Sequence, residues 1–289
     1  MAINKIYSSY NRSKTVVSLL NESEIITQQI KNLLSNRVPS SAVGYDPKTG
    51  NFESIYNLTK EYKVFEWLSI ASESFLKGEY SSFIDMKSCD PNSNMIVSVD
   101  TNLSLVNKTE QEKFELQGDL FQKEDLALIF SESYDEGGDV YDNNFTNFYG
   151  WHSKGSNKIF RIKKATQNKI FNLKSHPFSI YEKYFLIDSA YTIARGEDID
   201  PNAQCIKDLP LKTTKETLFL FYNFRPWKKE SFCADPKSGN KSGNVTIYSL
   251  NAKGFEILLR NDNLILNLTL AKRSKSGDEI KISTQKVIF

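Results

Sequence analysis

Residues 2–38, AINKIYSSYNRSKTVVSLLNESEIITQQIKNLLSNRV, contain neither glycine nor proline, and Pro39 follows them directly. Glycine and proline are the residues that most disfavour a helix interior, so this stretch predicts one long helix that ends before Pro39. At roughly 1.5 Å per residue it would be about 55 Å long. In the rest of the chain the helix- and strand-like segments are much shorter. We therefore expect a single long helix followed by a body built of short strands and loops.

The apolar side chains of this helix form two groups on different faces. One group lies in the first three turns and shares a face through three- and four-residue spacing: Ile3, Ile6, Tyr7 and Tyr10. The other lies in the last three turns: Ile26, Ile30, Leu33 and Leu34. At about 100° per residue the two groups point nearly half a turn apart. We expect the second group to pack on this protein's own body and the first to face other molecules, although a helix that winds around one body would give the same pattern.

Beyond Pro39 the sequence predicts a β-rich body, because 19 Phe and 14 Tyr favour strands. The strand-like segments are 64–70, 93–99, 126–131, 184–194, 218–224, 245–250, 255–259, 264–270 and 280–288, with 159–162 and 169–173 as a short antiparallel pair. Asn261-Asp262-Asn263 reads as a hairpin turn, since Asn and Asp tolerate positive φ. The predicted fold class is α+β, with the long N-terminal helix packed on an antiparallel β-sheet body. The predicted organisation is a helix at 1–38 and a globular domain at 39–289, with a possible insertion around 100–175.

The overall charge of the chain is nearly balanced, so it gives no indication of a polyanionic or polycationic partner. The formal net charge is +2 over 289 residues, and the isoelectric point near 8.2 is too mild to indicate DNA binding by itself. No apolar stretch approaches the ~20 residues that span a bilayer, and residues 1–20 lack the pattern of a signal peptide.

Three cysteines are too few for a disulfide framework. Cys205 and Cys233 lie in polar, loop-like surroundings and are a candidate disulfide, which would leave Cys89 unpaired. The sequence does not decide the pairing. Zinc needs four ligands, commonly with close Cys or His pairs, and no such pairs occur.

Catalytic motifs are absent from the sequence. His152 and His176 sit in no metal or nucleophile pattern, and no nucleophile elbow, phosphate-binding loop or dinucleotide-binding glycine pattern occurs. We therefore predict a protein that is not an enzyme and needs no cofactor.

One acidic segment is a candidate calcium site. Four carboxylates lie around Gly137-Gly138: Asp135, Glu136, Asp139 and Asp142. Hard carboxylate oxygens are the ligands calcium prefers. The segment lacks the EF-hand order of ligands, and a solvated acidic loop would have the same composition.

Two clusters of basic residues are candidates for nucleic-acid contact. Their members are Arg161, Lys163 and Lys164 in the first and Arg225, Trp227 and Lys228 in the second. Basic groups beside aromatic rings can bind phosphates and stack on bases. Alternating charge on a half-exposed strand would look the same.

Several segments resemble prepilin-type proteins. They are YEKYFLIDSAY at 181–191, LFLFYNFRPWKKE at 218–230, GNVTIYSL at 243–250, STQKVIF at 283–289 and SSYNRSKTVVSLLNESEIITQQIKNLLSNRV at 8–38. VFEWLSIASESFLKG at 64–78 and YSSFIDM at 80–86 are similar to the segment that follows the helix in this family. The chain thus resembles the soluble part of minor pilins and pseudopilins of type IV filament systems. The family's leader and hydrophobic N-terminal segment do not occur in this sequence, so we expect such a segment ahead of Ala2.

The resemblance implies a non-enzymatic structural subunit of a type IV pilus-like filament. Its partners would be other pilin or pseudopilin subunits, and the preceding apolar segment would anchor it in the inner membrane before assembly. The globular domain would then be exposed on a cell-surface or periplasmic filament for adhesion, DNA uptake or type II secretion, with DNA or a host surface as further partners. Two alternatives stay open: an extracellular adhesin or ligand-binding module that uses the loop 133–156, and an enzyme with an unfamiliar site.

Overall fold

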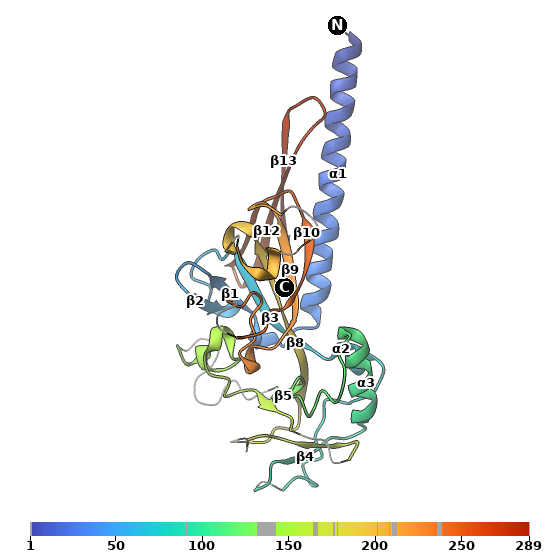
Figure 1. Cartoon of the computed structure of the whole chain (residues 1–289), viewed down its shortest axis with the longest axis vertical. Helices are drawn as coiled ribbons and strands as arrows, with labels where there is room; N and C mark the ends of the chain where they lie inside the picture. The colour runs from blue at the N-terminus through green and yellow to red at the C-terminus, as the bar shows by residue number, and fades with distance from the viewer. Residues whose placement is uncertain are drawn as a thin grey trace.

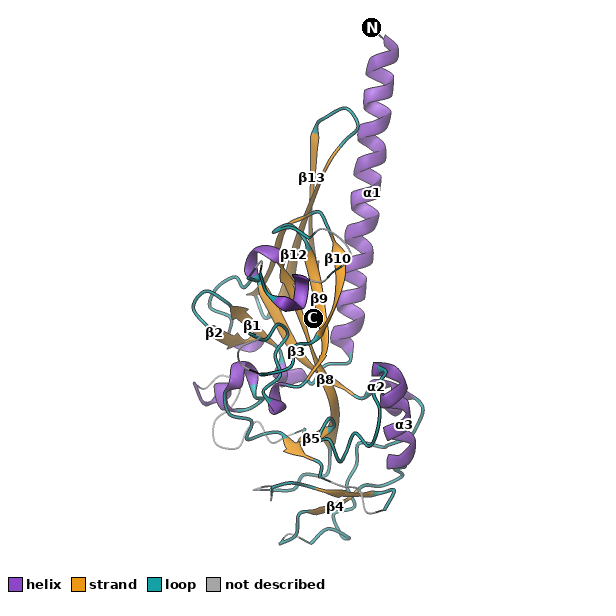
Figure 2. Ribbon diagram, in the orientation of Figure 1, coloured by secondary structure: helices purple, strands orange, loops and turns teal. Residues whose placement is uncertain are grey.

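The computed structural model describes residues 2–90, 92–131, 143–163, 167–175, 177, 179–200, 202–207, 209, 213–235 and 239–288. The long helix α1 (Ala2–Ser35) stands along one side of a β-rich body and extends beyond it at its N-terminal end (Figure 1). This confirms the predicted α+β class, with α1 as a long helix beside the strands of the body (Figure 2).

The C-terminal end of α1 is tied directly to the body. The Arg37 guanidinium donates to the Leu34 carbonyl at 2.8 Å, one of the carbonyls that a helix end leaves without a partner. The Val38 amide then donates to the Leu68 carbonyl at 2.9 Å. Pro39 opens a single turn of 3-10 helix, so the chain leaves the helix axis within a few residues.

The larger sheet is antiparallel, with the strand order β10-β9-β8-β3-β1-β2. Its strands are β1 (Val43–Asp46), β2 (Asn51–Ser54), β3 (Val64–Ile70), β8 (Tyr184–Arg195), β9 (Leu218–Phe224) and β10 (Asn244–Ser249). Strand β8 also pairs with β5 (Ala127–Phe130), which pairs with β6 (Phe160–Arg161). Side chains of alternate residues enter two cores, as in Phe65 and Trp67 on one face and Val64 and Leu68 on the other.

A second, three-stranded sheet packs with α1. It consists of β11 (Ala252–Arg260), β12 (Asn263–Arg273) and β13 (Glu279–Val287). Asn261 and Asp262 join the first two strands with φ of 51° and 59°, which confirms the predicted hairpin turn. The β12–β13 hairpin runs alongside α1 for much of its length (Figure 1).

The chain between β3 and β8 forms a lobe at the end of the molecule opposite the N-terminus (Figure 2). It contains α2 (Ser72–Leu76), α3 (Leu103–Phe114), β4 (Met95–Val97) and β7 (Ile170–Asn172) around a third hydrophobic cluster. The predicted insertion at 100–175 falls inside this interval. The predicted antiparallel pairing of 159–162 with 169–173 is confirmed only in part. An antiparallel bridge joins Ile162 to Leu173, and the Lys174 amide donates to the Arg161 carbonyl at 2.8 Å. The strands themselves pair elsewhere, β6 with β5 and β7 with β4.

The remaining described helices are short. They are α4 (Gln204–Lys207) and the 3-10 turns Pro39–Ser41, Ile55–Asn57, Asn143–Asn147, Trp151–Ser153, Gly196–Asp198 and Pro226–Lys228. Over the part of the chain that the structure describes, no helix has the length and apolar character needed to cross a membrane.

Replacement of Ile30 by alanine tests the packing of α1. Ile30 is fully buried, so Ile30→Ala should lower the free energy of unfolding by about 2–5 kcal/mol through lost contacts and a cavity. The matched change Ile6→Ala, at an exposed position of the same helix, should shift it by less than about 0.5 kcal/mol. Urea unfolding followed by circular dichroism measures both, and equal losses would contradict the division of the helix into two faces.

Candidate functional site

The outer face of α1 carries exposed apolar side chains. Ile6 is 69% exposed, Tyr7 62% and Tyr10 63%. They belong to the N-terminal part of α1, the end that extends beyond the β-rich body (Figure 1). The side chain of Ile3 lies outside the described residues. Large apolar groups on a projecting helix cost free energy in water unless another surface covers them.

The exposed face extends further along the helix than the first three turns. Val17 and Leu20 are also exposed, and positions 6, 10, 17 and 20 follow three-, four- and seven-residue spacing, which places them on one side of the helix. The intervening Leu19 is fully buried. The sequence did not predict the exposure of Val17 and Leu20. Residues 16–20 include apolar side chains on opposite sides of the helix, and the pattern alone does not show which side the body covers.

The inner face of α1 packs on this protein's own body, as predicted. Ile26, Ile30 and Leu34 are buried and Leu33 is partly buried. They share a hydrophobic cluster with residues of β3, β8, β9 and the three-stranded sheet: Phe65, Trp67, Ile193, Leu218, Leu266 and Leu268. One continuous helix therefore carries a face that is buried on the body and a face that is exposed.

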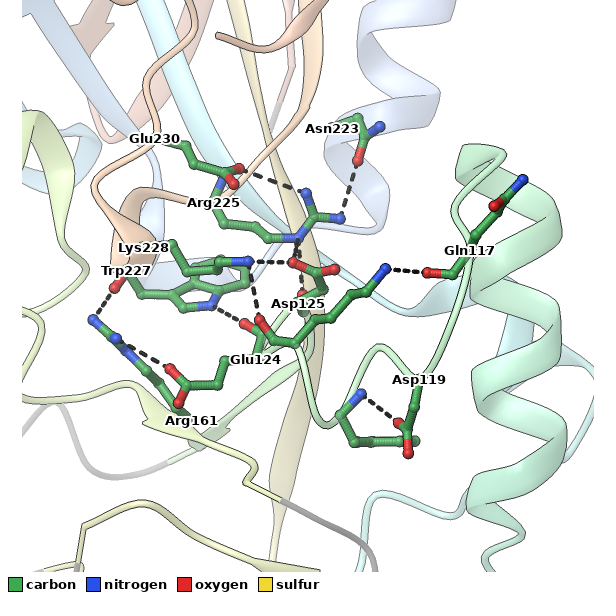
Figure 3. Close-up of polar contacts among 12 residues, drawn as sticks. Gln117, Asp119, Glu124, Asp125, Arg161, Asn223, Arg225, Trp227, Lys228 and Glu230 are labelled. Atoms are coloured by element: carbon green, nitrogen blue, oxygen red, sulfur yellow. Dashed lines mark hydrogen bonds and ion pairs between the residues drawn. The ribbon is translucent and has the colours of Figure 1, made fainter. Parts of the chain in front are cut away.

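The second basic cluster does not form a surface for nucleic acid. Arg225 and Trp227 are each 1% exposed, so neither can contact phosphates or stack on a base. The Arg225 guanidinium donates to the Asp125 carbonyl at 3.0 Å and lies 3.6 Å from the Glu230 carboxylate (Figure 3). The prediction of nucleic-acid contact is therefore wrong for these two residues. The Arg225 guanidinium pairs with carboxylates of the protein itself, and the Trp227 ring is buried in the core.

Lys228 and Arg161 contribute to the same internal network (Figure 3). The Lys228 ammonium lies 2.5 Å from the Asp125 carboxylate, and Arg161 pairs with the Glu124 carboxylate at 3.2 Å and donates to the Trp227 carbonyl. Cation–carboxylate contacts of this kind leave little free charge for phosphates. Among the remaining candidates Lys163 is exposed, and Lys164 lies outside the described residues.

The candidate disulfide is present in the structure. Cys205 and Cys233 are bonded with Cα atoms 5.5 Å apart, and Cys89 is a free thiol. Cys233 lines a pocket of about 570 Å³ together with Tyr45, His152, Asp198, Asp200 and Phe232. This pocket is larger than two other concave sites among the described residues, which have volumes of about 220 and 210 Å³.

A buried glutamate positions the histidine of this pocket. The Glu66 carboxylate lies 2.5 Å from His152 Nε2 and accepts the Thr192 hydroxyl at 2.9 Å. The His152 ring stacks on the Tyr45 ring with centroids 3.6 Å apart. Burial raises the pKa of Asp198, whose Oδ2 atom is buried and has no hydrogen-bond partner in the described part of the chain. The lining is thus acidic and aromatic, which suits a neutral or cationic ligand better than an anion.

The calcium candidates Asp135, Glu136, Asp139 and Asp142 lie outside the described residues, as does His176. In the ranges that the structure describes, no three Cys, His, Asp or Glu side chains are grouped so that they could hold a metal ion.

The α+β architecture, with a long N-terminal helix followed by an antiparallel sheet body, is compatible with the architecture of pilins. Comparison with known proteins returns no matching family model, no matching curated protein and no matching solved structure.

Arg225→Met tests the internal role of the basic cluster. The change removes the cation that the Asp125 and Glu230 carboxylates face, so the free energy of unfolding should fall by about 3–5 kcal/mol. The exposed Lys163→Ala change is the control and should cost less than about 0.5 kcal/mol. Chemical denaturation measures both, and an Arg225→Met protein as stable as the parent would contradict the structural assignment.

Proposed function

We propose that this chain is a structural subunit, of the minor pilin or pseudopilin kind, in a type IV pilus-like filament. The observation that carries the proposal is the outer face of α1, where Ile6, Tyr10 and Val17 are exposed on the side away from the body. Such subunits would associate through packing of these helices, without making or breaking a covalent bond.

The distribution of burial along α1 supports this role. The helix is held on its own body from Leu19 onward, and the outer face lies on the uninterrupted continuation of the same helix toward the N-terminus. Preorganised apolar surfaces lose little conformational entropy on binding, and apolar and aromatic side chains supply most of the energy of such interfaces. The outer face therefore has the chemistry of a helix–helix contact.

The arrangement of the body also supports a filament subunit. The lobe that contains α2, α3 and β4 lies at the end opposite the N-terminus (Figure 1), so packing of the N-terminal helix into a filament would leave the lobe exposed for adhesion, DNA uptake or secretion. The family resemblance of the sequence adds an apolar segment ahead of Ala2 that would hold the subunit in the inner membrane before assembly.

Filament incorporation in the organism that encodes this chain tests the proposal. The double change Ile6→Asp and Tyr10→Asp should reduce the amount of the protein in sheared surface filaments by on the order of tenfold or more, because each carboxylate would have to be desolvated in the helix contact. Quantitative immunoblotting of the sheared fraction and of whole cells measures the ratio.

The matched control is Leu76→Asp. Leu76 is 81% exposed but lies on α2 in the distal lobe, so this variant should enter filaments at the parental level. Unchanged melting temperatures of the purified variants would exclude misfolding. Normal incorporation of the double variant would refute the proposal.

The pocket beside the disulfide favours a second candidate function, an extracellular ligand-binding module. Its acidic and aromatic lining, with Asp198, Asp200 and Tyr45, suits a glycan, since sugar rings stack on aromatic faces and hydroxyls donate to carboxylates.

Glycan screening of the purified chain tests this candidate function. DNA fragments serve as the negative control, because the pocket carboxylates would repel their phosphates. Asp198→Asn should weaken binding of any glycan found by about tenfold, equivalent to the loss of a charge-assisted hydrogen bond of about 1.4 kcal/mol. Asp262→Asn, in the exposed β11–β12 turn, is the control and should bind like the parent. Retained affinity in the Asp198→Asn protein would place the ligand elsewhere.

A further inference from the structure

A cluster of three ionisable side chains lies between the distal lobe and the central strand β8. The Lys113 ammonium, near the C-terminal end of α3, contacts Asp188 Oδ2 on β8 directly. It also lies 3.7 Å from Glu110 Oε2, one turn earlier on α3. Asp188 and Glu110 are fully buried, and Lys113 is largely buried.

The cluster is buried, and an aromatic ring and two hydroxyl groups lie beside it. The Lys113 ammonium lies 4.7 Å from the centroid of the Phe114 ring. Ser74 donates to Glu110 Oε1 at 2.7 Å, and Ser189 donates to Asp188 Oδ1 at 3.0 Å. Glu110 Oε2 is buried and has no hydrogen-bond partner within the described part of the chain. The fold thus holds together, on a helix and a strand, an amine, the carboxyl group that it touches and a second carboxyl group, one of whose oxygens accepts no hydrogen bond from the described residues.

We infer that Lys113 and Asp188 form an intramolecular amide bond, and that Glu110 transfers the protons this condensation requires. The Lys113 ammonium first gives one proton to the Asp188 carboxylate, which leaves a neutral amine beside a neutral carboxylic acid. The amine nitrogen then attacks Asp188 Cγ. The Glu110 carboxyl group protonates the departing hydroxyl and takes a proton from nitrogen, so that a C–N bond forms, a C–O bond breaks and one water molecule leaves. Glu110 ends as it began, and no oxidant or other reactant is needed.

The protonation states agree with these roles. Burial and the Asp188 carboxylate raise the pKa of Glu110 to about 8, so this carboxyl group carries a proton at neutral pH and can donate it. Burial opposes the charge of Lys113, but Asp188 and Glu110 beside it raise its pKa above the usual value. The cluster therefore begins as an ammonium–carboxylate pair next to a neutral acid.

Two physical effects favour the amide over the ion pair. Removal of charged groups from water is costly, and condensation replaces a buried cation and a buried anion with one neutral group. The fold also holds the reacting groups in contact, and such intramolecular placement corresponds to effective concentrations of about 10⁵–10⁸ M. The bond would fasten α3 to β8 and so join the lobe covalently to the central sheet.

Intact mass spectrometry of the purified chain, unfolded and with its disulfide reduced, tests the inference. The measured mass should lie about 18 Da below the mass of the sequence, the weight of one water. After proteolysis, the peptides that contain Lys113 and Asp188 should be recovered as one branched species. A parent chain with the full mass of its sequence would overturn the inference and leave an ion pair.

Two variants and one control assign the chemistry. Lys113→Arg keeps the positive charge but provides no amine, and Glu110→Gln removes the transferable proton, so both chains should have the full mass of their sequences. The control is Lys228→Arg, because Lys228 also contacts a carboxylate, that of Asp125 at 2.5 Å, and the Arg225 guanidinium lies on the same carboxylate and keeps it charged. This variant should keep the deficit of about 18 Da. A deficit that persists in Lys113→Arg would also overturn the inference.

Discussion

The structure depends on the burial of one face of the second half of α1. Leu19, Ile30 and Leu34 enter a hydrophobic cluster that also includes residues of both sheets, so the helix and the two sheets share one core. Polar contacts at the edge of this core fix the position of the helix along the sheet. Ser23 donates to the Thr284 hydroxyl at 2.7 Å, and Lys286 pairs with Glu24 at 2.9 Å. The exposed pair contributes little to stability, so the apolar contacts supply most of the binding energy and the polar contacts supply the register.

Strand β8 connects this core to the distal lobe. Its C-terminal half pairs with β3 and β9, and Ile193 faces the helix side of the sheet. Its N-terminal half pairs with β5 and carries Leu186 into the core of the lobe. A force applied to α1 would therefore reach the lobe through one continuous strand, and Asp188 lies on that strand between the two cores. The contact between Asp188 and Lys113 of α3 joins the lobe to this strand, and it would therefore oppose separation of the lobe from the sheet.

Local patterns were sufficient to predict the main elements. The absence of glycine and proline before Pro39 predicted α1, and the apolar runs at 184–194 and 218–224 predicted β8 and β9 to within a residue. Pairing within the lobe was not predictable in the same way. β6 and β7 are short and close in sequence, and a bridge between Ile162 and Leu173 joins the residues that follow them. Their ladders are nevertheless with β5 and β4, because burial in the lobe core determines their position. The local sequence of a short strand does not indicate which strand, far away in the chain, will pair with it.

The basic cluster at 225–228 shows why the site residues were harder to predict than the fold. In the sequence, Arg225 and Lys228 beside Trp227 have the composition of a surface that binds phosphates. Their carboxylate partner Asp125 lies about 100 residues earlier in the chain, and no local pattern links the two segments. Each charged group in such a network is tolerated in the interior only because its partner is present, so the identity of a buried ion pair is a property of the tertiary structure. The outer face of α1 differs in this respect, since its apolar side chains lie on a single element and their spacing alone places them on one side of it. That is the physical reason why the apolar faces of a helix can be predicted from sequence while a buried charge network cannot.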